Sequence, residues 1–124
     1  MIAVIFEVTP ADDRRSAYLE LAAQLHARLE KIDGFLSIER FESLKMPGKI
    51  LSLSFWRDEE AIATWRNGPE HRAAQHAGRT STFSDYRLRI ASVIRDYGMT
   101  ERDEAPEDSQ AYHEERRKQQ GAQP

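Results

Sequence analysis

The segment WRNGPEHRAAQHAGR, which begins at Trp65, gathers side chains of types that could do chemistry. An imidazole can take up a proton near neutral pH, and carboxamide and guanidinium groups can donate hydrogen bonds to a developing oxyanion. An indole ring supplies a flat apolar wall. The segment therefore suggests proton abstraction from a flat, apolar substrate. The candidate residues are Trp65, His71, Arg72, Gln75 and His76.

The spacing of these residues predicts which of them lie together on a helix. His71 and Gln75 are four residues apart, as are Arg72 and His76, so each pair shares one helix face. The sequence leaves open which pair points inward, and an ordinary amphipathic connection between strands is the plainer alternative. Because proline suits the first helical position, we expect a separate short helix over Pro69–Ala77. No carboxylate or second histidine stands at metal-ligand spacing within that helix, so no metal site is predicted.

Composition bounds the kind of protein. The chain has 124 residues, enough for one domain, and 40% hydrophobic residues, enough for a small core. A net charge of −3 without a basic stripe argues against a nucleic-acid partner. The apolar runs are shorter than the roughly 20 residues of a membrane span. There is no cysteine, which excludes disulfides and thiolate chemistry, and we expect a cytoplasmic protein.

Charged residues concentrate at the C-terminal end. The chain is 31% charged, and residues 100–124 offer little beyond Tyr112 and a few alanines to bury. Such a stretch does not offset the entropy of its own ordering. We therefore predict a folded domain over residues 1–99 and a disordered tail over residues 100–124, with a transient helix at Tyr112–Gln120.

Hydrophobic periodicity predicts the element order β-α-β-β-α-β. Alternating or β-branched apolar runs indicate strands, and apolar residues at helical spacing indicate helices. This is the order of the ferredoxin-like split unit, an α+β fold whose four-stranded antiparallel sheet carries its helices on one face. The predicted strands cover residues 2–9, 35–44, 50–56 and 86–98, and the predicted helices residues 18–32 and 57–65.

The predicted strands are apolar on both sides. Ile5 and Phe6 point to opposite faces of the first strand, as Ile90 and Ala91 do in the last. At about 25 cal/mol per Å², an uncovered apolar face of about 500 Å² would forgo on the order of 12 kcal/mol. Helices on one face leave the other uncovered, so we expect a second copy of the chain to cover it, giving a homodimer.

Two strand carboxylates allow two interpretations. Glu7 and Glu39 sit among apolar neighbours, where a carboxylate facing a closed pocket would have a raised pKa and could act as a base. The alternative, which we favour, is an ion pair with Arg40, Arg87 or Arg89 at an edge or interface.

Several segments together resemble the antibiotic biosynthesis monooxygenase family. They are MIAVIFEVTP, KIDGFLSIERFES, PGKILSLSFWRDEEAIATWRN, HRAAQHAGR and DYRLRIASVIRDYG, and the SFWRDEEAIATWR block is the most specific. The resemblance covers about residues 1–98. It implies ferredoxin-like units that dimerise into an α+β barrel, and an oxidoreductase. Family members include cofactor-independent monooxygenases of polycyclic aromatic quinols and haem-degrading monooxygenases.

The resemblance carries over only in part to the haem-degrading branch. The tryptophan of that branch falls at Trp65, its strand asparagine at Glu7 and its histidine at Gln75. His76 stands one residue later, about 100° further around a helix, and does not substitute for that histidine. Haem is therefore the alternative cofactor, with His71 or His76 as the ligand.

The resemblance also implies a cofactor-independent monooxygenase that acts on an aromatic or quinol-like small molecule with O₂. Such an enzyme needs an apolar cage, a base, and a donor for the developing oxyanion. We assign the base to His71 and the donor to Gln75 or Arg72, with Trp65 in the catalytic set and His76 beside the substrate. The predicted cage consists of Phe6, Trp56, Trp65 and Phe83.

Three hypotheses therefore stand. The first is this dimeric monooxygenase without a cofactor, and the second is a barrel that binds or degrades haem. The third is a non-catalytic ligand-binding or interaction module. None of them involves nucleic acid or a membrane.

Overall fold

The computed structural model describes residues 1–69, 72–73, 76 and 83–121. The chain divides into two compact units, Met1–Ser92 and Val93–Pro124. The first unit contains a four-stranded sheet with helices packed on it, and the second contains helix α4. The elements are β1 (Ile2–Pro10), α1 (Arg15–Leu29), β2 (Phe35–Glu42), β3 (Ile50–Trp56), α2 (Glu59–Arg66), β4 (Phe83–Ser92) and α4 (Glu107–Gly121).

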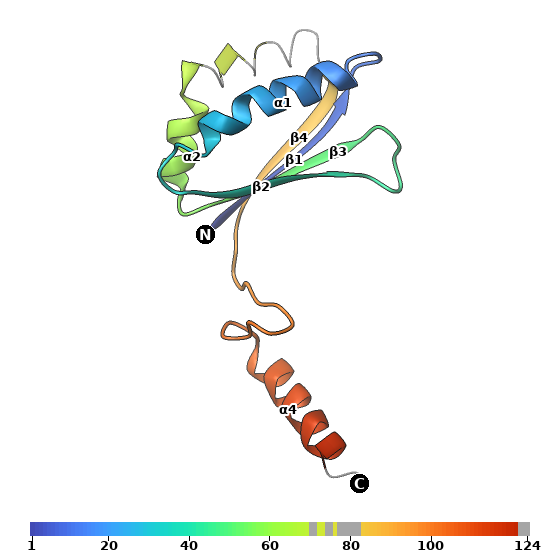
Figure 1. Ribbon diagram of the computed structural model, residues 1–124, viewed down its shortest axis with the longest axis vertical. Helices are drawn as coiled ribbons and strands as arrows, with labels where there is room; N and C mark the ends of the chain where they lie inside the picture. Colours follow the sequence, from blue (N-terminus) through green and yellow to red (C-terminus); the bar gives the residue numbers. More distant parts are fainter. Residues whose placement is uncertain (70–71, 74–75, 77–82, 122–124) are drawn as a thin grey trace. The chain divides into compact units, whose positions relative to one another are not determined.

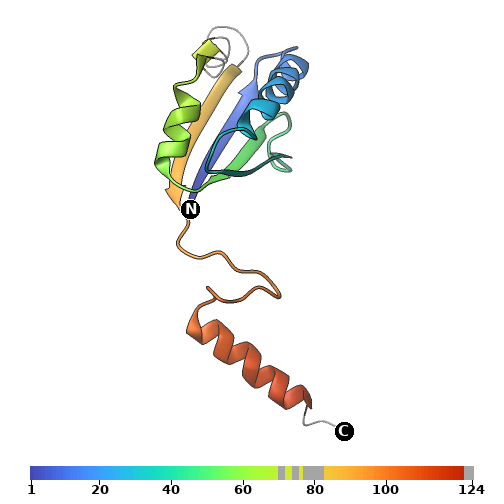
Figure 2. The same ribbon diagram turned by 60° about the vertical axis from the view of Figure 1, so that its left-hand side comes forward.

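The sheet has the strand order β2-β3-β1-β4, and each neighbouring pair is antiparallel. Helices α1 and α2 lie on the same side of it (Figures 1 and 2). This is the ferredoxin-like α+β arrangement, so the predicted fold class is confirmed. The order places β3 and β1 in the middle of the sheet, beneath the helices.

The last strand differs from its prediction. β4 runs from Phe83 to Ser92, whereas its apolar pattern predicted residues 86–98. It pairs with β1, and Ser92 lies opposite Ile2 near the N-terminus of the chain. A strand needs a neighbour to take up its backbone hydrogen bonds, and the pairing of β4 with β1 ends at Ser92 opposite Ile2. The prediction was wrong at both ends because pairing with β1, and not apolar content, sets the limits of this strand.

Helix α1 buries one stripe of its surface. Tyr18, Ala22 and Leu29 are buried, and their spacing returns to the same helix face. The N-cap position is Arg14, and no side chain caps it. Packing on the sheet, rather than capping, therefore holds this helix.

Two groups of buried side chains hold the helices to the sheet. The first group joins α1, β3 and α2, and the second joins β1, α1 and β3. Phe83 extends the second group, with its ring centroid 5.6 Å from that of Tyr18 in an edge-on contact. The first group consists of Leu29, Trp56, Ala61 and Ile62, and the second of Val8, Tyr18 and Ile50.

The C-terminal unit makes short-range contacts of its own. The Arg102 guanidinium lies 5.4 Å from the centre of the Tyr97 ring, and the Gln110 amide donates a hydrogen bond to the Ala105 carbonyl at 2.9 Å. Helix α4 includes the stretch from residue 112 to 120 for which the sequence suggested a helix. Disorder of the tail and the domain limit at residue 99 stay predictions.

We expect Gly34, between α1 and β2, to resist replacement. Its φ is +94°, and an added Cβ would lie 2.7 Å from the Cβ of Ala61 on α2. Gly34→Ala should lower the free energy of unfolding by about 3 kcal/mol or more, since backbone strain adds to overlap with a buried residue. Chemical denaturation followed by tryptophan fluorescence measures this loss.

Gly48→Ala is the matched control. Gly48 has a φ of +86°, but nothing lies within 4 Å of an added Cβ. This variant should lose only the energy of left-handed backbone, about 1–2 kcal/mol. Equal losses at the two glycines would show that the approach to Ala61 contributes nothing.

Candidate functional site

A cavity of about 350 Å³ lies between the helices and the sheet. Side chains of α1, of α2 and of all four strands border it. Its volume falls within the range of small-molecule sites, about 300–1,000 Å³. Most of the described lining residues are aliphatic or aromatic, so the cavity suits an apolar ligand.

The aromatic residues predicted to form a cage all lie on this cavity. Phe6 comes from β1, Trp56 from β3, Trp65 from α2 and Phe83 from β4. The rings of Phe6 and Phe83 meet edge-on, with their centroids 5.8 Å apart. Residues that are distant in the sequence thus form one aromatic lining.

Both tryptophans pack against the hydrophobic core, and both also line the cavity. Trp56 is 2% exposed, and its Nε1 donates a hydrogen bond to Ser54 Oγ at 2.9 Å. Phe35 packs edge-on against Trp56, with ring centroids 5.3 Å apart. Trp65 is half-buried and packs against the core group that contains Ile62. Rings held in this way present fixed apolar walls to a ligand.

The charged groups on the described lining are cationic. Arg40 comes from β2 and Arg66 from α2, and Ser52 and Ser54 of β3 lie on the same lining. The described lining residues include no carboxylate and no imidazole. The Nε of Arg40 is buried, and within the described chain it has no hydrogen-bond partner. The described lining therefore combines apolar walls with two cationic side chains.

Sequence reasoning did not select Arg40 or Ser52 as site residues. The available signal is strand alternation, which puts Ile38 and Arg40 on one face of β2, and Ser52 and Ser54 on one face of β3. Arg40 lies opposite Ser52, and Ser52 lies opposite Phe6. This register turns both faces toward the helices, and it cannot be read from either strand alone.

The predicted catalytic segment is described only in part. His71 and Gln75, the predicted base and donor, lie outside the residues that the structure describes. Arg72 and His76 are exposed, and neither belongs to the described lining of the cavity. Arg72 donates a hydrogen bond to Asn67 Oδ1. The roles assigned to these residues stay predictions.

Glu7 faces away from the cavity, on the other side of the sheet. Its carboxylate lies 3.4 Å from Lys49 Nζ and 3.3 Å from Arg89 Nη1. The hydrogen bond from Lys49, with a smaller contribution from Arg89, holds the pKa of Glu7 below its ordinary value. The interpretation of Glu7 as a base with a raised pKa is therefore wrong, and the favoured ion pair is confirmed.

The family model of antibiotic biosynthesis monooxygenases matches residues 1–77. The chain belongs to this family. The match includes β1, α1, β2, β3 and α2, which carry most of the cavity lining. It also includes the SFWRDEEAIATWR block on which the resemblance was most specific.

A curated relative of this family member is the jasmonate monooxygenase ABM of Pyricularia oryzae. The two sequences are 46% identical over 93 residues, which make up 75% of this chain and 43% of the relative. The chain thus spans less than half of the length of that protein.

Solved structures of low sequence identity share the fold. Rv0793 from Mycobacterium tuberculosis has a TM-score of 0.70 at 20% identity, over 78% of this chain and 98% of that one. SnoaB, a cofactor-independent oxygenase from Streptomyces nogalater, has a TM-score of 0.66 at 12% identity, over 77% of this chain and 94% of that one. These similarities support the ferredoxin-like fold.

Two further kinds of feature are absent from the described part of this family member. No group of three or more histidine, cysteine or acidic side chains there could hold a metal ion. Likewise, no helix among those residues combines the length and the apolar character needed to cross a membrane.

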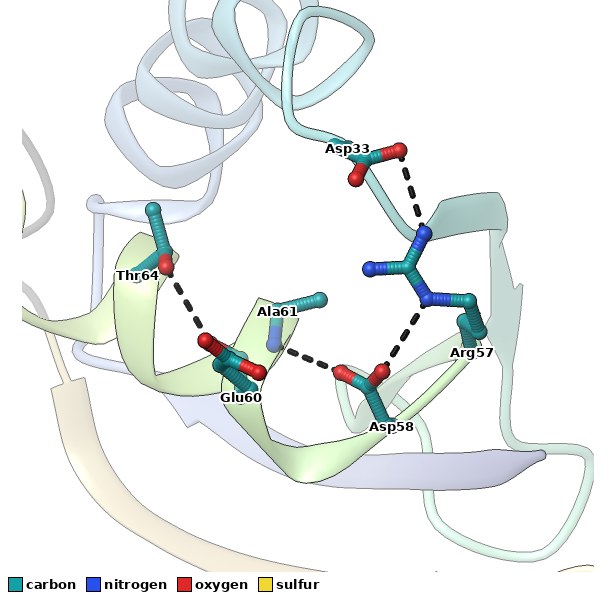
Figure 3. Close-up of polar contacts among 6 residues, drawn as sticks. All are labelled: Asp33, Arg57, Asp58, Glu60, Ala61 and Thr64. Carbon is teal, nitrogen blue, oxygen red and sulfur yellow. Dashed lines mark hydrogen bonds and ion pairs between the residues drawn. The ribbon is translucent and has the colours of Figure 1, made fainter.

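A charged cluster anchors the start of α2, the helix that carries Trp65 (Figure 3). Asp58 is the N-cap residue, and its Oδ1 accepts a hydrogen bond from the Ala61 N–H at 2.9 Å. Arg57 Nε donates to Asp58 Oδ2 at 3.0 Å, and Arg57 Nη1 lies 3.1 Å from Asp33 Oδ1. The cluster ties the first turn of α2 to the loop that follows α1.

These hydrogen bonds lower the pKa of Asp58, with the Ala61 N–H as the largest cause and Arg57 next. The ionised carboxylate is therefore the form that stabilises the fold. Its contribution is complete above the pKa of an unfolded aspartate, about 3.9. It is lost as the pH falls through the lower pKa of the folded state.

We expect Asp58→Ala to lower the melting temperature at neutral pH, because it removes both the cap and a partner of Arg57. Asp58→Asn keeps an acceptor for the Ala61 N–H without the charge and should lose less. Below about pH 4, stability should fall more steeply in the wild type than in Asp58→Asn. Thermal denaturation by circular dichroism across this pH range is the measurement. Equal neutral-pH melting temperatures for the two variants would contradict the role of the cap.

Proposed function

We propose that this chain is a cofactor-independent monooxygenase that oxidises an aromatic or quinol-like small molecule in the cavity beside Trp65. The observation that carries the proposal is the cavity itself, with Phe6, Trp56 and Phe83 as its other aromatic walls. Family membership supports the reaction type. The description of SnoaB, which has the same fold, as a cofactor-independent oxygenase supports the absence of a cofactor.

The reaction requires a substrate with a readily lost proton. Removal of that proton from an activated CH₂ group leaves an electron-rich carbanion, which passes one electron to O₂. Combination of the two radicals forms a peroxide anion, which takes up a proton and then loses water. R₂CH₂ and O₂ thus give R₂C=O and H₂O, and the substrate supplies all the electrons that reduce O₂. An apolar cavity favours this sequence because it keeps bulk water from the carbanion.

The base is proposed to be His71, with Gln75 or Arg72 as the donor to the developing oxyanion. The described lining offers neither an imidazole nor a carboxylate, so this role falls to a residue outside it. The indole of Trp65 is proposed to pack against the substrate ring and fix its plane.

Two observations bear on other candidate ligands. The name of the Pyricularia oryzae relative suggests a jasmonate as a second substrate class for the same cavity. Glu7 stands at the position of the strand asparagine in the haem-degrading branch, and it forms ion pairs on the opposite side of the sheet. This orientation argues against haem cleavage.

We also propose that the outer face of the sheet, the side away from α1 and α2, pairs with a second copy of the chain. Leu51, Leu53 and Phe55 of β3 alternate with the cavity-facing serines and point to this face. Phe41 of β2 lies opposite Leu51 and is 43% exposed. Two such apolar faces in contact would give the homodimer predicted from the sequence, in the form of the α+β barrel that the family resemblance implies.

The oxygenase activity is tested by oxygen uptake with dithranol, a hydroxylated anthrone. We expect one O₂ consumed for each quinone formed, with and without a metal chelator. His71→Ala should lower kcat by about 100-fold or more, because general-base catalysis is lost. The control is His26→Ala, since His26 is half exposed on α1 and paired with Glu30.

Each other outcome selects a different hypothesis. Unchanged turnover by His71→Ala would reject the base assignment and leave the activity in place. No oxygen uptake together with a Soret shift on addition of haem would support a haem-binding protein. No response in either measurement would support a non-catalytic module.

The dimer is tested by light scattering coupled to size-exclusion chromatography. The wild type should elute with twice the mass of the chain, and Leu53→Asp should shift the mass toward the monomer, because it buries an unpaired charge in the interface. Leu44→Asp makes the same change at a fully exposed residue of the β2–β3 connection and should leave the dimer intact. A monomeric wild type would contradict the proposal.

A further inference from the structure

Arg40 is a polar group of the cavity that the proposed reaction leaves without a role. It lies on the edge strand β2 opposite Ser52 of β3, and Ser52 lies opposite Phe6 of β1. All three side chains line the cavity. Arg40 therefore lines the cavity beside a serine and in the same row as an aromatic wall.

Arg40 finds no acceptor within the described chain, and its Nε is buried. Other arginines of the first unit do find carboxylates: Arg15 pairs with Glu42, and Arg57 with Asp33. The large majority of buried polar side-chain atoms in proteins have a hydrogen-bond partner. An arginine also cannot remove its charge by losing a proton. A permanently charged, half-buried side chain whose Nε is buried without a partner in the described chain is available to an acceptor that a ligand brings.

We propose that Arg40 binds a carboxylate of the substrate, so that the cavity takes an apolar carboxylic acid. The planar guanidinium can hold both carboxylate oxygens in a bidentate pair, and the Ser52 hydroxyl supplies a further donor. The proposal rests on the proposed function of the cavity and narrows its substrate class. It adds a recognition residue to a site whose other described walls are mainly apolar.

The donor set fits a carboxylate better than a phosphate. Ser54, the other cavity serine, already accepts the hydrogen bond of Trp56 Nε1. Arg66 also lines the cavity, but it is exposed to solvent, which screens its charge. One half-buried arginine and one hydroxyl can match a single negative charge. A phosphate dianion would keep uncompensated charge in an apolar cavity, which is unfavourable.

Binding at Arg40 would also orient the rest of the ligand. With its carboxylate held at β2, an apolar body extends over Ser52 toward Phe6 and lies against the tryptophan walls. Fixing a substrate at one end while its body packs on rigid rings sets which carbon faces the base. Arg40 is thus a residue that binds and positions the substrate.

The test compares ligands that differ in charge and share a body. Jasmonate and its methyl ester form one pair, and 2-naphthoate and its methyl ester form the other. Titration calorimetry gives the affinities, and tryptophan emission reports occupancy because both tryptophans of the chain line the cavity. The wild type should bind at least one acid more tightly than its ester. Arg40→Met should weaken binding of that acid by about 10- to 100-fold, with little change for the ester.

Matched variants locate the effect. Arg40→Lys keeps a charge without the planar fork and should retain part of the preference for the acid. Arg14→Met makes the same change at an exposed residue before α1 and should bind like the wild type. Arg66→Met should lose less than Arg40→Met. A loss confined to Arg66→Met would overturn the assignment, as would wild-type affinity in Arg40→Met.

If circular dichroism shows that Arg40→Met does not fold, the test uses Arg40→Lys and the comparison of acid with ester in the wild type. A wild type without preference for either acid would overturn the proposal. The binding test needs no turnover. Arg40-dependent binding without any oxygen uptake would support the recognition role and reject the oxygenase. Oxygen uptake without a preference for acids would support the oxygenase and reject the recognition role of Arg40.

Discussion

The candidate site depends on two small side chains in the middle of the sheet. Ser52 and Ser54 lie on the central strand β3 beneath the helices, and they are 7% and 5% exposed. Leu51, Leu53 and Phe55 of that strand point the other way, while Ile50 and Trp56 stand on either side of the two serines on the inner face. Protein interiors leave few voids, so two small residues between two large ones on the inner face of a central strand leave room for a hollow. Ser54 also accepts the indole N–H of Trp56, which fixes one wall of that hollow.

The two faces of the sheet differ in whether their charged side chains have ion-pair partners. On the outer face, Glu7 forms ion pairs with Lys49 and Arg89, and these contacts favour its ionised form. On the cavity face, the described lining has Arg40 and Arg66 and no acidic partner. A cation in apolar surroundings raises the affinity for an anion more than the same cation in water, because the local dielectric is low. The sheet thus separates a face on which Glu7 is ion-paired from a cavity whose described charged side chains are both cationic.

Part of this arrangement could be predicted from the sequence. Strand β3 has the predicted limits, and α2 (Glu59–Arg66) agrees within two residues with the helix predicted over residues 57–65. Those predictions rest on local periodicity, which the chain carries in itself. The limits of β4 were wrong because they depend on β1, a strand far away in the sequence. Apolar residues such as Ile94 extended the pattern, and in the folded chain that residue is 82% exposed.

The sequence alone determined the order of the elements, the aromatic residues available for a cage, and the family. Only the tertiary structure decided that Arg40 and not Glu39 enters the cavity. Both residues stand next to each other on β2, where side chains alternate between faces, and a register shift lies between Phe35 and Ser37. One residue of slip would exchange the two faces. The face that turns inward is set by pairing with β3 and by the helices packed above it, and these are contacts that no single strand encodes.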